Sequence, residues 1–147
     1  MELKNISNQE LQMRIENLVR SERKMMHVIL QHIIEFEDRR LYAVLGYDSM
    51  FSYLTCALGY SESGAYRRIQ SARLLKRLPE IANKIESGTL NLSKLTQVQK
   101  CLTQLKKQNK SVTPQLTKEI LNKIELTNGL ETQKILAFEF DLPVLTQ

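Results

Sequence analysis

The spacing of apolar residues in the first third of the chain predicts one long amphipathic helix. Ser7, with Glu10 three residues later, matches the capping box found at helix starts. No Gly or Pro then interrupts the chain before Gly46. We therefore expect a helix of about 30 residues, about 45 Å long. Its apolar positions recur at intervals of three or four residues, or of their sum, at Leu11, Ile15, Leu18, Met25, Ile29 and Phe36.

Such a helix is longer than a small domain covers, so residues 1–47 are assigned to a docking or dimerisation element. Residues 8–36 are predicted to pack on the rest of the domain or on a second copy of the chain, as a homodimer. Glu22 and His32 fall on the same heptad seam as the apolar positions. Their polarity disfavours a strict coiled coil.

Gly, Pro and capping residues divide the remainder into shorter helices. Asp48 is predicted to cap a short helix from Ser49 to Leu58, closed by Gly59. Ser61 caps the next helix, which must end before Pro79. Further helices are expected at 79–86, 93–107, 114–126 and 130–138, and an extended tail is expected at 139–147.

Composition supports an all-α fold, with a multi-helix bundle at residues 48–138. The chain of 147 residues has only five Gly and three Pro, and 42% of its residues are hydrophobic. No apolar run approaches the roughly 20 residues that cross a bilayer, and the polar start MELKNISNQE is unlike a signal peptide. Cys56 and Cys101 form no CxxC pair, so we expect small core residues in a reducing cytoplasm.

Charge is distributed unevenly along the chain. The net charge is +5, yet residues 1–47 balance seven basic against seven acidic side chains. Residues 87–118 contain six Lys and no acidic residue. Such a bias favours a polyanionic partner, most often nucleic acid, with Lys106 and Lys107 as candidates for backbone phosphates. The alternative is a solvated Lys-rich face.

The segment FSYLTCALGYSESGAYRRIQSARLL, residues 51–75, predicts a helix-turn-helix within residues 48–77. That motif needs a short first helix, a tight turn with a glycine and a capped second helix. Gly59 and Ser61 supply the turn and the cap. The apolar contacts that join the two helices are predicted to come from Leu54, Leu58, Tyr60, Ala65 and Ile69.

The second helix, Ser61 to Arg77, presents a polar face suited to double-stranded DNA. At 100° per residue, Ser63, Arg67 and Gln70 point away from the apolar side. Arg67 suits a guanine edge and Gln70 an adenine edge. Backbone phosphates suit Ser61, Ser63, Arg73, Lys76 and Arg77, while Tyr66 and Arg68 lie on the two flanks of this face.

Three features of this helix leave alternatives open. Glu62 suits either a cytosine contact or a role at the helix start. Leu74 lies near the outward face, which indicates that another helix covers the later turns. Outward arginines are usually solvated, and many helix-turn-helix pairs never touch DNA.

Residues 39–95 resemble the helical N-terminal region of bacterial HNH-endonuclease-type proteins. The motifs are RRLY followed by GYDS, then LGYSES, AYRRI and SAR, and finally a Pro-led helix ending in SGTLNLS. The stretch from LGYSES to LNLS is also similar, more loosely, to the helix-turn-helix region of ParB-type partition proteins. Both resemblances imply DNA binding. They match the recognition-helix motif at Ser61, Ser63, Tyr66, Arg67 and Arg68.

The nuclease module of those endonucleases needs a His-Asn-His metal site, which this sequence lacks. His27 and His32 are five residues apart, about 140° around a helix, and cannot share a metal ion from one face. The acidic cluster of Glu35, Glu37 and Asp38 is expected to cap or to pair with Arg39, Arg40 and nearby basic groups. No Ser-His-Asp or P-loop motif occurs.

We therefore expect a non-catalytic chain with no metal, cofactor or small-molecule substrate. The leading interpretation is a DNA-binding module, acting alone or as the targeting domain of an HNH-type nuclease. The alternative is a helical protein-interaction or dimerisation module that uses residues 8–36 and does not bind DNA.

Overall fold

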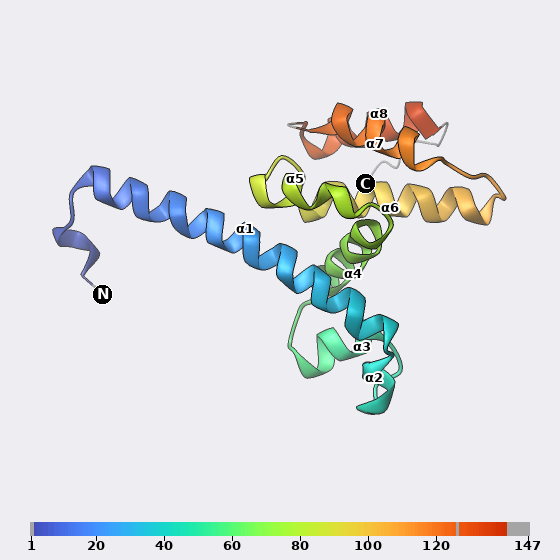
Figure 1. Cartoon of the computed structure of the whole chain (residues 1–147), viewed down its shortest axis with the longest axis horizontal. Coiled ribbons are helices and arrows are strands. Elements are labelled where there is room, and N and C mark those ends of the chain that lie inside the picture. The colour runs from blue at the N-terminus through green and yellow to red at the C-terminus, as the bar shows by residue number, and fades with distance from the viewer. Residues whose placement is uncertain (1, 126, 141–147) are drawn as a thin grey trace.

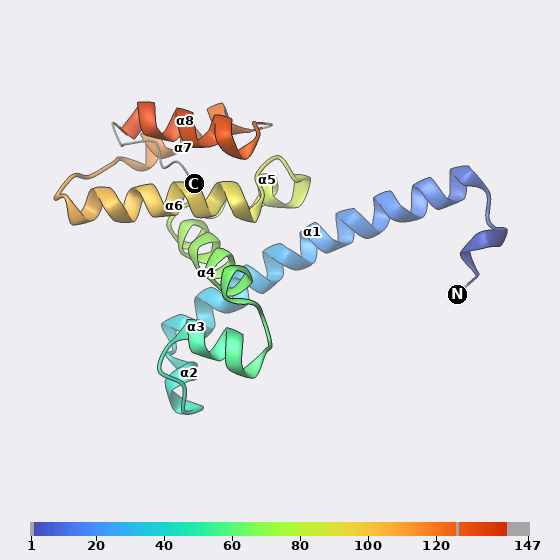
Figure 2. The same ribbon diagram turned by 180° about the vertical axis from the view of Figure 1, so that it is seen from behind.

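The predicted all-α fold is confirmed in a computed structural model that describes residues 2–125 and 127–140. No strand occurs in those two ranges. One long helix extends away from a group of shorter helices, and both ribbon views show its N-terminal half projecting alone (Figures 1 and 2). Within the described ranges, none of the helices combines the length and the hydropathy needed to span a bilayer.

The long helix, α1, spans Asn8–Asp38, as the sequence predicts. The Ser7 Oγ caps it by accepting a hydrogen bond from the Glu10 N–H at 3.1 Å. The Glu10 carboxylate bonds Arg14 at 2.8 Å instead of returning to the cap, so only half of the capping box forms. Residues 8–22, here called the N-terminal arm, contain no buried side chain.

The C-terminal half of α1 packs against the rest of the molecule, and its Leu30 and Ile33 side chains are buried. Docking begins at Arg23, whose guanidinium donates to the Ser87 carbonyl at 3.2 Å. His27 follows, with its Nδ1 2.9 Å from Glu86 Oε1. Ser87 and Glu86 belong to α5, Ala82–Ser87, which follows a 3₁₀ turn at Pro79–Ile81.

The chain then reverses through two short helices, α2 at Leu41–Val44 and α3 at Met50–Ser52. Arg40 separates α1 from α2 by adopting a left-handed conformation with a φ of 53°. The cap of α3 is Ser49 and not Asp48 as predicted, since the Ser49 Oγ accepts the Ser52 N–H at 3.0 Å.

The predicted single helix from Ser49 to Leu58 is also wrong in its second half, which is a π-helical segment at Tyr53–Ala57. The Leu58 N–H bonds the Tyr53 carbonyl five residues earlier. The wider turn moves Leu58 out of line with Leu54, because a π-turn holds more than 3.6 residues. Leu54 is therefore buried while Leu58 is exposed, which contradicts its predicted role in joining the helices.

Helix α4, Glu62–Arg77, is the centre of the fold and lies between α1 and α6, Leu92–Lys107 (Figure 1). Two side-chain to backbone bonds tie α4 to α6. The Ser71 Oγ donates to the Leu92 carbonyl, and the Thr96 Oγ1 donates to the Arg67 carbonyl, each at 3.3 Å. Leu74 is fully buried, so the expectation that its turn of α4 is covered is confirmed.

Helices α7, Pro114–Ile124, and α8, Gly129–Phe140, form a further layer on α6 (Figure 1). The predicted extended tail at 139–147 is wrong for Glu139 and Phe140, which belong to α8. Phe140 is buried, and Glu139 pairs with Lys123 at 2.5 Å, so both have reasons to stay in the helix. Residues 141–147 and position 126 of the predicted 114–126 helix lie outside the described residues.

The two cysteines differ in environment. Cys101 is partly buried in α6, and that burial raises the pKa of its thiol. Cys56 is exposed, so its predicted place in the core is wrong. The reason is its position on the solvent side of the π-helical segment.

We predict that Leu95→Ala lowers the free energy of unfolding by about 2–5 kcal/mol, because a fully buried leucine is lost and a cavity remains. Urea unfolding followed by circular dichroism measures the change. Leu130→Ala is the control, since Leu130 is exposed and its loss should change stability by no more than about 0.5 kcal/mol. Equal losses for the two variants would contradict the assigned core.

Candidate nucleic-acid interface on helix α4

The start of α4 is built as the sequence predicts. Gly59 adopts a φ of +76°, which ends the π-helical segment and turns the chain. The Ser61 Oγ then accepts the Gly64 N–H at 3.0 Å. A Cβ added at Gly64 would come within 2.9 Å of that Oγ, so the glycine allows the cap and the turn to approach closely. Ser61, Glu62 and Ser63 are all exposed in this first turn.

Arg68 holds the turn together from inside. Its guanidinium carbon lies 4.3 Å from the centre of the Tyr60 ring, a cation–π contact. Its Nη1 also donates to the Gly64 carbonyl at 3.0 Å. Arg68 is half-buried by these contacts and does not share the exposed face of Ser63 and Arg67. Its predicted role in DNA binding therefore competes with a structural role in the turn.

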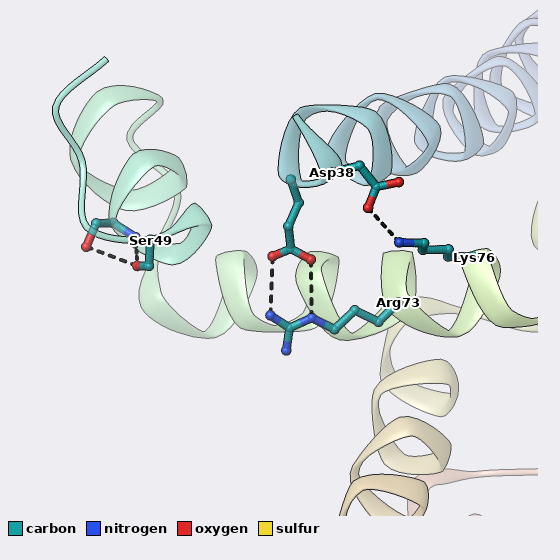
Figure 3. Close-up of polar contacts among 6 residues, drawn as sticks. Asp38, Ser49, Arg73 and Lys76 are labelled. Atoms are coloured by element: carbon teal, nitrogen blue, oxygen red, sulfur yellow. Dashed lines mark hydrogen bonds and ion pairs between the residues drawn. The ribbon is translucent and has the colours of Figure 1, made fainter. Parts of the chain in front are cut away.

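Arg73 and Lys76 are both paired with carboxylates at the end of α1 (Figure 3). The Arg73 guanidinium bonds both carboxylate oxygens of Glu37, at 3.2 and 3.4 Å. Lys76 Nζ lies 2.6 Å from Asp38 Oδ1. Carboxylates at a helix C-terminus are disfavoured by the helix dipole. The two cations of α4 therefore stabilise the end of α1 and join the two helices.

The expectation that the acidic cluster pairs with basic groups is confirmed, although two of its partners come from α4. Glu35 alone pairs locally, with Arg39 at 3.6 Å. The hydrogen bond to Asp38 and that carboxylate's charge raise the pKa of Lys76. A raised pKa keeps Lys76 protonated up to more alkaline pH, so this attraction is fully present at neutral pH and is lost only as the pH rises past that pKa.

Gln70 is the clearest correction to the predicted outward face. It is only 8% exposed and lines a cavity of about 290 Å³ between α4, the end of α1 and the α2–α3 region. The side chains of Phe51, Tyr66 and Arg73 line the same cavity and are more exposed than Gln70. Gln70 is therefore not presented at the surface as a reader of an intact base pair.

The exposed polar residues at the cap and along α4 are Ser61, Glu62, Ser63, Tyr66, Arg67, Arg73, Lys76 and Arg77, of which Arg73 and Lys76 are ion-paired. Arg67 and Arg77 have no carboxylate partner among the residues that the structure describes. They bracket the ion-paired part of the helix, with Arg67 beside α6 and Arg77 in the last turn.

The α6 lysines extend this basic surface in another direction. Lys106 and Lys107 are exposed in the last turn of α6. Sequence reasoning missed Lys100, which is also exposed and lies one turn beyond Thr96, the residue that bonds the Arg67 carbonyl. The signal was present, since Lys100 belongs to the same acid-free segment. Arg67 therefore lies beside the part of α6 that precedes Lys100 by one turn, whereas Lys106 and Lys107 belong to the last turn of α6, the end of the helix that lies away from its crossing with α4 (Figure 1).

The two histidines contact different partners. His27 meets Glu86, and His32 Nδ1 contacts the Val28 carbonyl at 2.7 Å within α1. In residues 2–125 and 127–140, no group of three or more His, Cys, Asp or Glu side chains is arranged to hold a metal ion.

Comparisons of the chain with protein-family models, with curated proteins and with solved structures find no match. The resemblances at residues 39–95 therefore remain predictions.

We predict that Glu37 and Arg73 are coupled by less than about 1 kcal/mol, because both side chains are partly exposed to solvent. A double-mutant cycle with Glu37→Gln and Arg73→Gln, read from urea unfolding, measures this coupling. It should shrink at high salt. Arg39→Gln serves as the control for a neighbouring cation outside the pair, and strictly additive changes at low salt would show that the pair is absent in solution.

Proposed function

We propose that this chain is a non-catalytic module that binds double-stranded DNA through the exposed residues of α4 and the exposed lysines of α6. The observation that carries the proposal is the set of exposed cations without a carboxylate partner among the described residues. On these two helices and the loop after α6, the set comprises Arg67, Arg77, Lys100, Lys106, Lys107 and Lys110.

Charge pairing divides the basic residues of the molecule into two groups. Lys84 and Lys118 contact Glu125 and Glu80 and join helices of the core. Arg73 and Lys76 join α4 to α1 in the same way. The unpaired cations keep their full charge for a partner, and a polyanion releases its own counterions when it meets them.

The first two turns of α4 have the chemistry of a DNA-contacting surface. The exposed first turn carries Ser61 and Ser63 hydroxyls and backbone N–H groups at the positive end of the helix dipole. Arg67, one turn further, supplies a guanidinium for a base edge or a phosphate. Residues at the start of a recognition helix make the base contacts in helix-turn-helix proteins, and the corresponding residues of α4, Ser61, Ser63 and Arg67, are exposed.

We predict that Arg67→Ala weakens binding to a short DNA duplex by about 1–3 kcal/mol if Arg67 contacts a base. Fluorescence anisotropy of labelled DNA across a salt series measures the affinity of each variant. Arg20→Ala, which removes the same charge from the N-terminal arm, is the matched control and should bind as the unmodified protein does.

The same salt series tests the α6 lysines. The double variant Lys106→Ala with Lys107→Ala should reduce the log–log salt slope by about 0.9 for each lost phosphate contact. No binding to any duplex at low salt would refute DNA binding, and unchanged binding by the Arg67 variant would show that α4 is not the contacting helix.

A second candidate function is self-association through α1, and a specific observation favours it. The apolar side chains on one side of the N-terminal arm are exposed, with 68% exposure at Leu18. Leu11 and Ile15 lie on the same stripe, and Met25 continues it beyond the arm. Exposed apolar stripes of this kind favour helix pairing, so we propose a second copy of the chain as the partner.

We predict that Leu18→Glu abolishes concentration-dependent association, because it places a charge in the apolar stripe. Sedimentation equilibrium over a range of concentrations measures the mass. Asn17→Glu is the matched control, since it adds the same charge on another side of the arm and should leave the association unchanged. A monomer at every concentration for the unmodified chain would remove this candidate.

A further inference from the structure

The cavity beside α4 contains a polar side chain that makes no hydrogen bond to the rest of the described molecule. Gln70 lines it and is more than nine-tenths buried, yet no described residue hydrogen-bonds its side-chain amide. A recessed amide that has no protein partner is left to bond water or a ligand in the cavity that it lines. The amide presents one N–H donor edge and one carbonyl acceptor side by side.

Two aromatic side chains flank the same space. Phe51 comes from α3 and Tyr66 from α4, and both line the cavity while remaining more than a third exposed. Half-exposed aromatic rings at the mouth of a cavity offer faces on which a planar group stacks. The volume of about 290 Å³ suits one small ring system.

The charges in the wall select against an anionic ligand. Arg73 lines the cavity, but Glu37 lines it too and bonds the guanidinium through both carboxylate oxygens. The two charges compensate each other, so a free phosphate or carboxylate gains little there. A neutral planar group with a donor and an acceptor fits better. Outside the cavity, Arg67 and Arg77 stay unpaired among the described residues and are available for phosphates.

We propose that this cavity receives one unpaired nucleobase of the bound DNA, held by the Gln70 amide and stacked on Phe51 and Tyr66. The inference rests on the proposed DNA binding and adds to it a preference for duplexes with a base out of the stack. A planar base meets the Gln70 amide along its donor and acceptor edge. Stacking on aromatic side chains tolerates any base identity. Arg67 and Arg77 then contact the sugar–phosphate backbone on either side.

The test compares an intact duplex with the same duplex carrying a single bulged 2-aminopurine. The chain contains no Trp, so the fluorescence of the bulged base is read without interference from tryptophan. We expect the bulged duplex to bind about 5- to 10-fold more tightly, in line with the stacking of one base. We also expect its fluorescence to fall on binding.

Two variants assign the effect to the cavity. Gln70→Leu keeps the side-chain volume and removes the amide, and Phe51→Ala removes one ring. Each should reduce the preference for the bulge toward equality while leaving affinity for the intact duplex unchanged. Gln104→Ala, at an exposed position of α6, is the matched control and should retain the preference. A circular dichroism melt confirms folding of each variant.

The outcomes separate this inference from the proposed function. Equal affinity for the two duplexes, or a preference that survives both variants, overturns the base-binding cavity while DNA binding stands. No binding to either duplex overturns both. Saturable quenching of free 2-aminopurine riboside at the concentrations used for the bulged duplex would assign the cavity to a small molecule and overturn its assignment to DNA.

Discussion

The burial of α4 between two other helices is the constraint on which the rest of the structure depends. Ala65, Ala72 and Leu75 fill one side of it and Leu74 another, so α1 and α6 are positioned by contact with the same sixteen-residue element. A helix packed on two sides keeps only a narrow polar strip. Which residues of α4 are exposed to a partner therefore depends on α1 and α6 as much as on the sequence of α4 itself.

The C-terminal end of α1 uses part of that polar strip for ion pairs. Glu37 and Asp38 sit where the dipole of α1 is negative, and the side chains that neutralise them come from the middle and end of α4. This contact gives two of the five arginines and lysines of α4, Arg73 and Lys76, a structural role. Among the described residues, the exposed cations of α4 without a carboxylate partner are Arg67 and Arg77, and the others of the proposed interface lie on α6 and the loop after it.

Local signals predicted the fold well. The caps at Ser7 and Ser61 act within single turns and are visible in the sequence, and each forms as expected. The π-helical segment at Tyr53–Ala57 was not predictable, because no propensity distinguishes it from an ordinary turn. The site was predicted in part. Helical periodicity placed Gln70 correctly around α4 but carries no information about Phe51 and Glu37, which come from other elements and enclose it.

Helix α1 has no Gly or Pro along its length, and it serves both the N-terminal arm and the wall of the cavity. Leu18 and Glu37 are separated by about 28 Å of continuous helix, at 1.5 Å per residue. One unbroken helix therefore carries both the exposed apolar stripe and the carboxylate that holds Arg73, so a substitution that breaks α1 would alter both surfaces at once.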